Sequence, residues 1–195
     1  MPNRSDNRIT IHLIEDDASQ RDSIESLLNF KGYITKSYSK AKDFLKTAHF
    51  ERPAIVISDI RLPDISGVEL HQALIEKDIN IPIIFISGEA SIQQSIDAMK
   101  QGAIEFLVKP FEIDELINAV TKAIRIELKE INLNLLLKNL SPRELEVHRL
   151  LVEGFNNQEL LDKLHLSLPT VKQYKSEVMR KLNVKSLSKL IELTR

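Results

Sequence analysis

Short apolar runs alternate with amphipathic segments through the first 125 residues, and this alternation constrains the fold more than any other feature of the chain. Apolar runs of strand length lie at residues 9–14, 33–37, 54–58, 83–87 and 105–108. Segments with helical periodicity lie at residues 21–30, 40–48, 68–76, 92–100 and 113–126. Because parallel strands need crossover helices of one hand, this order predicts an α/β fold with a doubly wound, five-stranded parallel sheet.

The part of the chain after residue 139 is predicted to be wholly helical. Ser141, Pro142 and Glu144 supply an N-cap, a first-position proline and a third-position acid, which together start a helix through Val152. Gly154 is predicted to end that helix. Further helices are expected from Asn156 or Asn157 to Leu164, from Ser167 to Leu182, and after Ser186. Four short helices, with a tight turn at residues 165–167, predict an all-α helix-turn-helix domain.

The domain organisation follows from these two patterns. The chain has 195 residues, which fits one α/β domain and one small second domain. Residues 127–139 are rich in Leu and Asn and hold no Gly or Pro, so they are predicted to extend the last helix or to form a helical linker. The predicted bounds are therefore 1–126 for the first domain, 127–139 for the linker and 140–195 for the second domain.

The composition excludes several classes of protein. No stretch approaches the roughly 20 continuous apolar residues of a membrane span. The polar residues 1–8 lack the apolar core of a signal peptide, so we expect a cytoplasmic protein with no membrane partner. The absence of cysteine excludes disulfides, thiolate zinc sites and thiol nucleophiles. The histidines show no metal-ligand spacing and are expected to be local polar or half-buried residues: His12, His49, His71, His148 and His165.

The net charge of −1 conceals an asymmetry between the two parts of the chain. Residues 1–137 carry 16 Lys and Arg against 21 Asp and Glu, a balance of −5. Residues 138–195 carry 11 against 7, a balance of +4. The balance favours nucleic acid as a partner of the second part alone, although a charge of this size is weak evidence by itself.

Polar side chains follow the predicted strands of the first domain. Glu15 and Asp16 follow the first strand, Asp59 the third, Ser87 ends the fourth, and Lys109 follows the fifth. Because functional groups of open α/β sheets gather at the carboxyl ends of the strands, we expect these side chains to converge. Three carboxylates in a partly desolvated pocket repel one another unless a cation neutralises them, and hard oxygen ligands favour Mg²⁺.

This set of groups predicts phosphoryl chemistry. With Mg²⁺ screening the charge of an incoming phosphoryl group, the central carboxylate of Asp59 is free to attack phosphorus in line. Lys109 and Ser87 would then contact phosphoryl oxygens. The simpler interpretation of single residues is that the acids at positions 15–17 cap the first helix and that Lys109 is a solvated surface charge, but the complete set favours the phosphoryl site.

Three stretches closely resemble the CheY-like receiver domain: residues 14–17 (IEDD), 58–67 (SDIRLPDISG) and 102–111 (GAIEFLVKPF). The similarity covers residues 9–126 and implies a flavodoxin-like receiver. It implies that Asp59 is the phosphoacceptor and that Glu15 and Asp16 are the acidic pair, with Asp16 the direct metal ligand. The backbone carbonyl of Arg61 would complete the protein's share of the Mg²⁺ coordination.

The same resemblance implies roles for further residues. A cis peptide is expected at Lys109–Pro110, where proline removes most of the trans preference and the lysine is aimed inward. Phe106 would be the switch aromatic that moves toward the pocket when Ser87 engages phosphate, although without the family a plain core residue explains it equally well. Glu89 would lie near the phosphoryl group and tune dephosphorylation, in a direction that the sequence does not give.

One helix of the second domain has a polar face suited to DNA. Its apolar positions are spaced by three and four residues and define a core-facing side: Val171, Tyr174, Val178 and Leu182. The opposite side presents groups that contact phosphates or read base edges in the major groove: Lys172, Gln173, Lys175, Ser176 and Arg180. A basic helix face taken alone is more often merely solvated, so the helix-turn-helix context carries this prediction.

The second domain resembles the LuxR-type domain of NarL/FixJ family response regulators. The resemblance rests on residues 140–144 (LSPRE), 154, 157, 159–160, 170–172 (TVK) and 181–184 (KLNV), and spans residues 140–193. It implies a recognition helix over residues 167–182, with Lys172, Gln173 and Ser176 nearest the bases and Thr170, Lys175 and Arg180 near phosphates. Leu161 and Tyr174 depart from the usual Ala and His, and the larger Leu161 is expected to alter helix packing unless it is compensated.

Together these features predict a two-component response regulator and not an enzyme. A sensor histidine kinase would phosphorylate Asp59, the surfaces around residues 92–100 and 105–111 would change, and homodimers would bind promoter DNA to regulate transcription. One alternative is an aspartyl phosphatase of the haloacid dehalogenase type, but Arg61 stands where such enzymes place their acid/base Asp. The other is a regulator that ignores phosphate, which the complete set of pocket residues disfavours.

Overall fold

The computed structural model describes residues 9–88 and 99–194. The chain forms two compact units, Met1–Lys129 and Glu130–Arg195. Glu89 and the predicted helix at residues 92–100, apart from its last two positions, lie outside the described residues. In the part of the chain that is described, no helix combines the length and the apolar character needed to cross a membrane.

The first unit is built on the predicted parallel sheet. Its strands are β1 (Thr10–Ile14), β2 (Ile34–Tyr38), β3 (Ala54–Asp59), β4 (Ile83–Ser87) and β5 (Glu105–Val108). Their order is β2-β1-β3-β4-β5, and every neighbouring pair is parallel. The prediction of a doubly wound, five-stranded sheet is confirmed: the inner strands β1, β3 and β4 are almost wholly buried, whereas the edge strands β2 and β5 are partly exposed.

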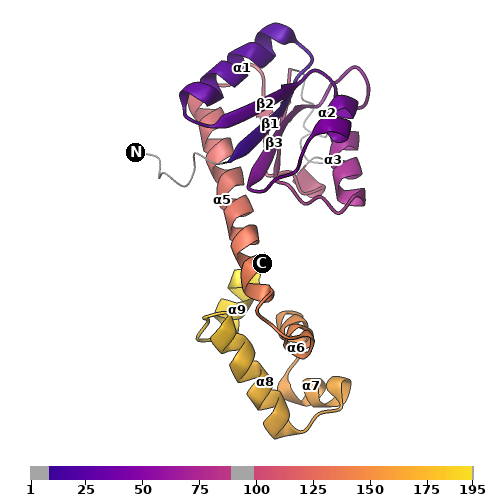
Figure 1. The fold of residues 1–195 in the computed structure, drawn as a ribbon, viewed down its shortest axis with the longest axis vertical. Coiled ribbons are helices and arrows are strands. Elements are labelled where there is room, and N and C mark those ends of the chain that lie inside the picture. The colour runs from indigo at the N-terminus through magenta and orange to yellow at the C-terminus, as the bar shows by residue number, and fades with distance from the viewer. Residues whose placement is uncertain (1–8, 89–98, 195) are drawn as a thin grey trace. The chain divides into compact units, whose positions relative to one another are not determined.

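Helices cover both faces of this sheet, as Figure 1 shows. Helices α1 (Ala18–Phe30) and α5 (Ile113–Leu137) cover one face, and α2 (Ala41–Thr47) and α3 (Gly67–Glu76) cover the other. Side chains alternate along the strands, so that Ile55 and Ile57 of β3 pack toward α1 and α5 while Val56 packs toward α2 and α3. Each face therefore has its own apolar core.

One helix of this unit begins earlier than predicted, and another runs on into the predicted linker. Helix α1 begins at Ala18, three residues earlier than expected, because the Asp17 carboxylate accepts a hydrogen bond from Gln20 N at 2.8 Å and caps it. Helix α5 continues without interruption to Leu137, as expected of a segment that was predicted to extend the last helix. Its residues Leu116, Val120 and Ala123 lie in the core of the first unit.

A buried ion pair joins α5 to the start of β3. The Glu127 side chain is fully buried and accepts from Arg52 Nε at 2.9 Å, from Arg52 NH2 at 2.6 Å and from Ala54 N at 3.0 Å. The bidentate guanidinium and the backbone N–H satisfy both carboxylate oxygens, which is the condition for burying such a charge. Sequence patterns gave no sign of this pair, since its partners lie 75 residues apart.

The histidines were predicted to be local polar or half-buried residues, and the structure corrects this for three of them. His12, His71 and His148 are buried, whereas the other two are exposed. The ring of His12 packs among Tyr38, Phe44 and Phe50. Burial, with a smaller contribution from the charge of Lys36, lowers the pKa of His12 from 6.5 to about 4, so the ring is neutral at neutral pH.

The second unit contains the four predicted short helices α6 (Pro142–Val152), α7 (Asn157–Leu164), α8 (Leu168–Lys181) and α9 (Leu187–Thr194). Ser141, Asn156 and Ser167 are the N-caps of the first three, so the choice left open between Asn156 and Asn157 falls to the former. Gly154 has φ +96°, a conformation that lets the chain turn after α6. The short turn between α7 and α8 passes through His165 with φ 52°.

Candidate functional site

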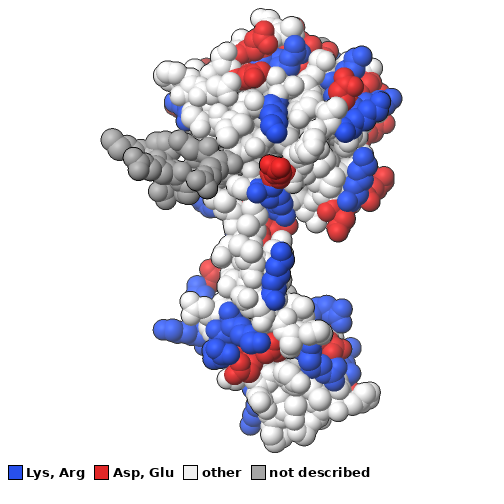
Figure 2. Space-filling model, viewed as in Figure 1, with Lys and Arg blue, Asp and Glu red and all other residues white. Residues whose placement is uncertain are grey.

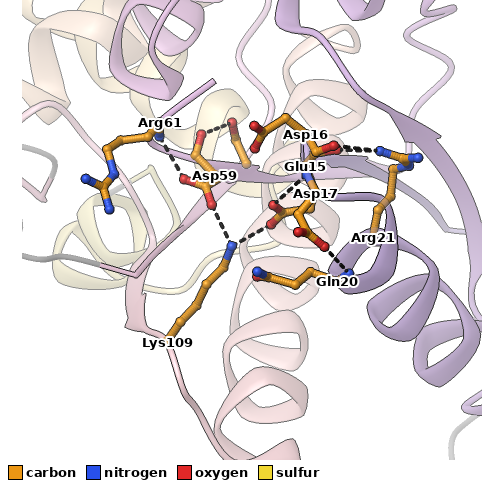
Figure 3. Close-up of polar contacts among 9 residues, drawn as sticks. Glu15, Asp16, Asp17, Gln20, Arg21, Asp59, Arg61 and Lys109 are labelled. Atoms are coloured by element: carbon orange, nitrogen blue, oxygen red, sulfur yellow. Dashed lines mark hydrogen bonds and ion pairs between the residues drawn. The ribbon is translucent and has the colours of Figure 1, made fainter. Parts of the chain in front are cut away.

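Acidic side chains and one lysine meet where strands of the sheet end. Glu15 directly follows β1, Asp59 is the last residue of β3, and Lys109 directly follows β5. The Lys109 ammonium donates to Glu15 Oε2 at 2.7 Å and to Asp59 Oδ2 at 2.5 Å, and so bridges the two carboxylates (Figure 3). Parallel pairing brings these groups together although 94 and 50 residues separate Lys109 from its partners.

The electrostatics of this pocket are set by burial and by the lysine. Glu15 and Asp59 are only 1% and 6% exposed. Burial raises the pKa of Glu15, and the charge of Asp59 adds to this effect, while the contact with Lys109 opposes it. Burial alone would lower the pKa of Lys109, but its hydrogen bonds to Asp59 and Glu15 outweigh burial and raise it. One ammonium therefore stays charged beside two closely spaced acids.

Asp16 brings a third carboxylate to the same place. Carboxylate oxygens of Glu15, Asp16 and Asp59 lie within 4.8 Å of one another. Arg21 holds the loop that carries the first two, because its NH1 group donates to Glu15 O at 2.9 Å and to Asp16 O at 3.3 Å. Arg21 had no role in the sequence analysis. Asp17 is the N-cap of α1, which is the simpler role considered for it.

The oxygen ligands of this cluster fit a hard divalent cation. Glu15 and Asp59 are buried, whereas Asp16 is exposed, so a cation at this point would be held by the protein on one side and open to solvent on the other. Mg²⁺ favours such sites, since it takes a few carboxylates and keeps several waters. Lys109 bridges only two of the three carboxylates, so the cluster keeps negative charge that a cation can neutralise.

The remaining residues predicted for this pocket lie just after β3 or on the strands β4 and β5. Its second oxygen, Oδ1, accepts from Arg61 N at 2.7 Å, and the side chain of Arg61 extends away from the carboxylates (Figure 3). Ser87 ends β4 and is 1% exposed, and its backbone oxygen accepts from Lys109 N at 2.8 Å. Phe106 pairs with Phe85 across β5 and β4 and packs, partly buried, against the core under α2 and α3. The Lys109–Pro110 peptide is cis, as predicted.

Gly67, at the start of α3, is a pocket residue to which the sequence analysis gave no role. Its N–H donates to Ile60 O at 2.9 Å, directly behind the site. A Cβ at this position would lie 3.0 Å from Ser58 Oγ and 2.5 Å from Asp59 O, and the second distance is shorter than real Cβ contacts allow. Only glycine therefore leaves the backbone of Asp59 in place. The signal in the sequence was its place as the last residue of the receiver-like stretch 58–67, directly after Ser66, the N-cap of α3.

Asp64 also acquires a role that only the structure shows. Its carboxylate accepts from Ala41 N at 3.2 Å and from Lys42 N at 2.7 Å, and so caps α2, whose own N-cap Lys40 makes no side-chain cap bond. Burial alone would raise the pKa of Asp64, but these backbone hydrogen bonds outweigh it and lower the pKa. The loop after Asp59 is thereby fixed to a second helix.

Helix α8 presents the polar face predicted for DNA. Val171 and Val178 are fully buried, Leu182 is nearly so, and Tyr174 packs partly buried against the same core. The exposed residues of the opposite face are Lys172, Gln173, Ser176 and Arg180, whereas Thr170 and Lys175 are half-buried. Figure 2 shows Lys and Arg over the visible face of the unit that holds α6–α9, with fewer Asp and Glu among them. Cations and hydrogen-bonding groups thus share one helix face.

Some of these predicted DNA contacts already have partners within the protein. Arg180 donates to Glu177 Oε2 at 2.7 and 3.2 Å, and Lys175 lies 3.5 Å from Asn157 Oδ1. The Arg180 pair is exposed and the Lys175 pair is half-buried, so a phosphate can compete more easily for Arg180. Leu161, the unusually large residue of α7, packs partly buried against the core of this unit.

Comparison with known proteins identifies both units. Residues 11–121 match the response regulator receiver domain, and residues 138–194 match the luxR family of bacterial regulatory proteins. Nodulation protein W of Bradyrhizobium diazoefficiens is 35% identical over 94% of this chain and 84% of its own length. Transcriptional regulatory protein FixJ of Rhizobium meliloti is 34% identical over 94% of both chains.

A solved structure that matches almost the whole chain extends the similarity to the fold. The response regulator StyR superposes with a TM-score of 0.60 at 33% identity, over 95% of this chain and 98% of its own. The matches cover the receiver pocket and the helix-turn-helix together. The chain therefore belongs to the NarL/FixJ family of two-component transcription regulators, in which a receiver domain precedes a LuxR-type DNA-binding domain.

Proposed function

We propose that Asp59 accepts a phosphoryl group from a sensor histidine kinase in the presence of Mg²⁺. The observation that carries this proposal is the Lys109 ammonium, which reaches Asp59 and Glu15 together inside a cluster of three carboxylates. An ammonium at hydrogen-bond distance from the attacking oxygen is already placed for a phosphoryl oxygen that arrives there.

The residues around Asp59 define the steps of the transfer. Asp59 attacks phosphorus, so that an O–P bond forms while the P–N bond to the histidine of the kinase breaks and the imidazole leaves with the bonding electrons. The hydrogen bond from Arg61 N holds Oδ1, which leaves Oδ2, on the side of Lys109, as the attacking oxygen. Lys109 then passes from the carboxylate to a phosphoryl oxygen, and the Ser87 hydroxyl donates to another.

The metal would be held by the carboxylates of Glu15, Asp16 and Asp59 and by the backbone carbonyl of Arg61. When bound, Mg²⁺ screens the charge of the incoming phosphoryl group. Burial of Glu15 and Asp59 strengthens this attraction, since charges interact more strongly away from water. Arg21 keeps the loop of Glu15 and Asp16 in position for the same purpose.

Phosphorylation would change the surface that governs assembly and DNA binding. Ser87 and Phe106 lie on the neighbouring strands β4 and β5, so a shift of one toward the phosphoryl group frees space for the other. The proposed outcome is a homodimer whose two α8 helices bind promoter DNA. A bias of a few kcal/mol toward the active surface is enough to change promoter occupancy.

Phosphoryl uptake from a small-molecule phosphodonor tests the assignment without any need for the kinase. The full-length chain is incubated with phosphoramidate and Mg²⁺, and the mass gain of one phosphoryl group is measured with time. Asp59→Asn is expected to abolish the gain, and removal of Mg²⁺ by a chelator is expected to slow it strongly. Asp17→Asn is the matched control, because Asn also caps helices and Asp17 lies outside the metal cluster. Uptake by Asp59→Asn equal to that of the wild type would refute the assignment.

A further inference from the structure

Glu144 makes two kinds of contact with one carboxylate. It is the third residue of α6, and its Oε2 accepts from the N–H of the N-cap Ser141 at 2.6 Å, which closes a capping box. The same oxygen accepts from Lys181 Nζ at 2.7 Å. Its side chain is 8% exposed and that of Lys181 is 27% exposed, so the pair is largely removed from water.

The pair with Lys181 differs from its neighbours because it joins two helices. Lys181 is the last residue of α8 and lies 37 residues from Glu144. By contrast, ion pairs such as Arg143–Glu146, Arg180–Glu177 and Lys189–Glu192 each join residues three positions apart in one helix, and all of them are more exposed. Exposed pairs within a helix contribute little, whereas a shielded pair between helices constrains how the helices lie.

The charge of this pair is well defined. The hydrogen bond from Lys181, and after it the backbone N–H of Ser141, lower the pKa of Glu144, so its carboxylate is ionised at neutral pH. The Lys181 ammonium is thus bound to a carboxylate of the protein itself. Arg180, the next residue back, has a side chain 68% exposed and lies on the face predicted for DNA.

We propose that Glu144 is a positioning residue for DNA recognition, which holds the end of α8 against the start of α6 through Lys181. The base-reading face of α8 then meets the major groove in one register, because the helix cannot turn or slide at its far end. Lys181 acts through this link and not as a phosphate contact. The inference rests on the proposed binding of promoter DNA by α8.

A substitution at Glu144 distinguishes a positioning role from a simple charge effect, because the two predict changes of opposite sign in the affinity for specific DNA. Glu144→Gln removes a negative charge from a domain that binds a polyanion, so charge alone predicts tighter binding. The capping box also tolerates glutamine, so α6 keeps its start. If Glu144 positions α8, the same substitution weakens binding to a specific site while non-specific binding stays the same or tightens.

The experiment uses the full-length chain and two probes. A duplex selected from a random-sequence pool by the phosphodonor-treated wild type is the specific probe, and a duplex of scrambled sequence is the non-specific one. Glu144→Gln and Lys181→Met are each expected to lower affinity for the selected duplex roughly tenfold, the equivalent of one charge-assisted hydrogen bond. Affinity for the scrambled duplex is expected to change little in both variants. Lys181→Arg keeps a cation beside Glu144 and is expected to bind the selected duplex as the wild type does.

Matched variants make each outcome decisive. Lys189→Met removes an exposed lysine of α9 and is expected to leave the selected binding unchanged. Equal losses on both probes for Lys181→Met, with a salt dependence reduced by about one phosphate contact, would mean that Lys181 contacts DNA and would overturn the proposal. Wild-type or tighter specific binding by Glu144→Gln would also overturn it.

Two further outcomes are covered by the same set. If Glu144→Gln loses helical content by circular dichroism, Lys181→Met decides, because Lys181 takes no part in the capping box. If the wild type selects no duplex at all, DNA binding by α8 itself is refuted and the positioning role falls with it. Loss in the variants alone, with the wild type binding normally, supports the positioning role.

Discussion

Replacing Gly67 with alanine should damage the phosphoryl site through the backbone of Asp59. The new Cβ would lie 2.5 Å from Asp59 O, 3.0 Å from Ser58 Oγ and 3.2 Å from Ile60 Cα. The nearest of these atoms belongs to the backbone of a central strand, which cannot move aside as a flexible side chain can. Overpacking of this kind costs about 1–3 kcal/mol. The lower entropy of the unfolded alanine chain returns only about 0.4–1 kcal/mol, so the net effect is destabilising.

Urea unfolding and phosphoryl uptake measure the two consequences. With a slope of about 1–3 kcal/mol per molar urea, the unfolding midpoint of Gly67→Ala should fall by roughly 1 M. Its uptake of phosphate from a small phosphodonor should slow by roughly tenfold or more, because displacement of a reacting group is costly. Gly88→Ala is the control, since a Cβ there meets nothing within 4 Å. If both alanine variants are equally stable and equally active, the steric argument is wrong.

Three other perturbations test the charges of the receiver unit. Arg52→Met should lower the free energy of unfolding in urea by about 3 kcal/mol, because Glu127 is left buried without its cation. Lys122→Met, which breaks an exposed pair, should cost under about 1 kcal/mol. Similar losses of stability in the two variants would contradict the argument. The free energy of unfolding of the wild type should fall as pH drops from 6.5 toward about 4, because His12 takes up a proton in the unfolded chain but stays neutral in the native protein. His12→Leu should reduce this loss, and an unchanged dependence on pH would refute the argument. Lys109→Met should tighten Mg²⁺ binding by roughly tenfold in calorimetry, because a competing cation is lost from the acid cluster. Weaker binding would refute this competition, and unchanged binding would argue against a metal at this cluster.

Much of the receiver pocket could be predicted from the sequence, because topology alone places its residues. Once five parallel strands are inferred, their carboxyl ends must share one edge, and Glu15, Asp59 and Lys109 follow such ends. Their convergence needed no knowledge of side-chain packing. The sequence could not show which role each acid has: Asp17 caps α1, whereas the carboxylate of Asp16 lies near that of Asp59.

A cap whose two partners lie in one segment can be inferred from the sequence, whereas a cap supplied by a distant segment cannot. Ser141, Asn156 and Ser167 accept from N–H groups within three residues, so the sequence itself contains both partners. Helix α2 has no such local cap and depends on Asp64, which comes from a loop 22 residues away. No pattern within one segment can reveal a partner in another.

The sequence by itself determined the order of elements, both folds and the family, because periodicity, caps and motifs are formed by residues that lie close together in the chain. Only the tertiary structure decided which distant groups pair: Glu127 with Arg52, Glu144 with Lys181, and Gly67 with the backbone of Asp59. Each of these depends on the distance between atoms of segments that the fold brings together. Such distances follow from the packing of whole helices against a sheet or against one another, and a linear pattern does not encode them.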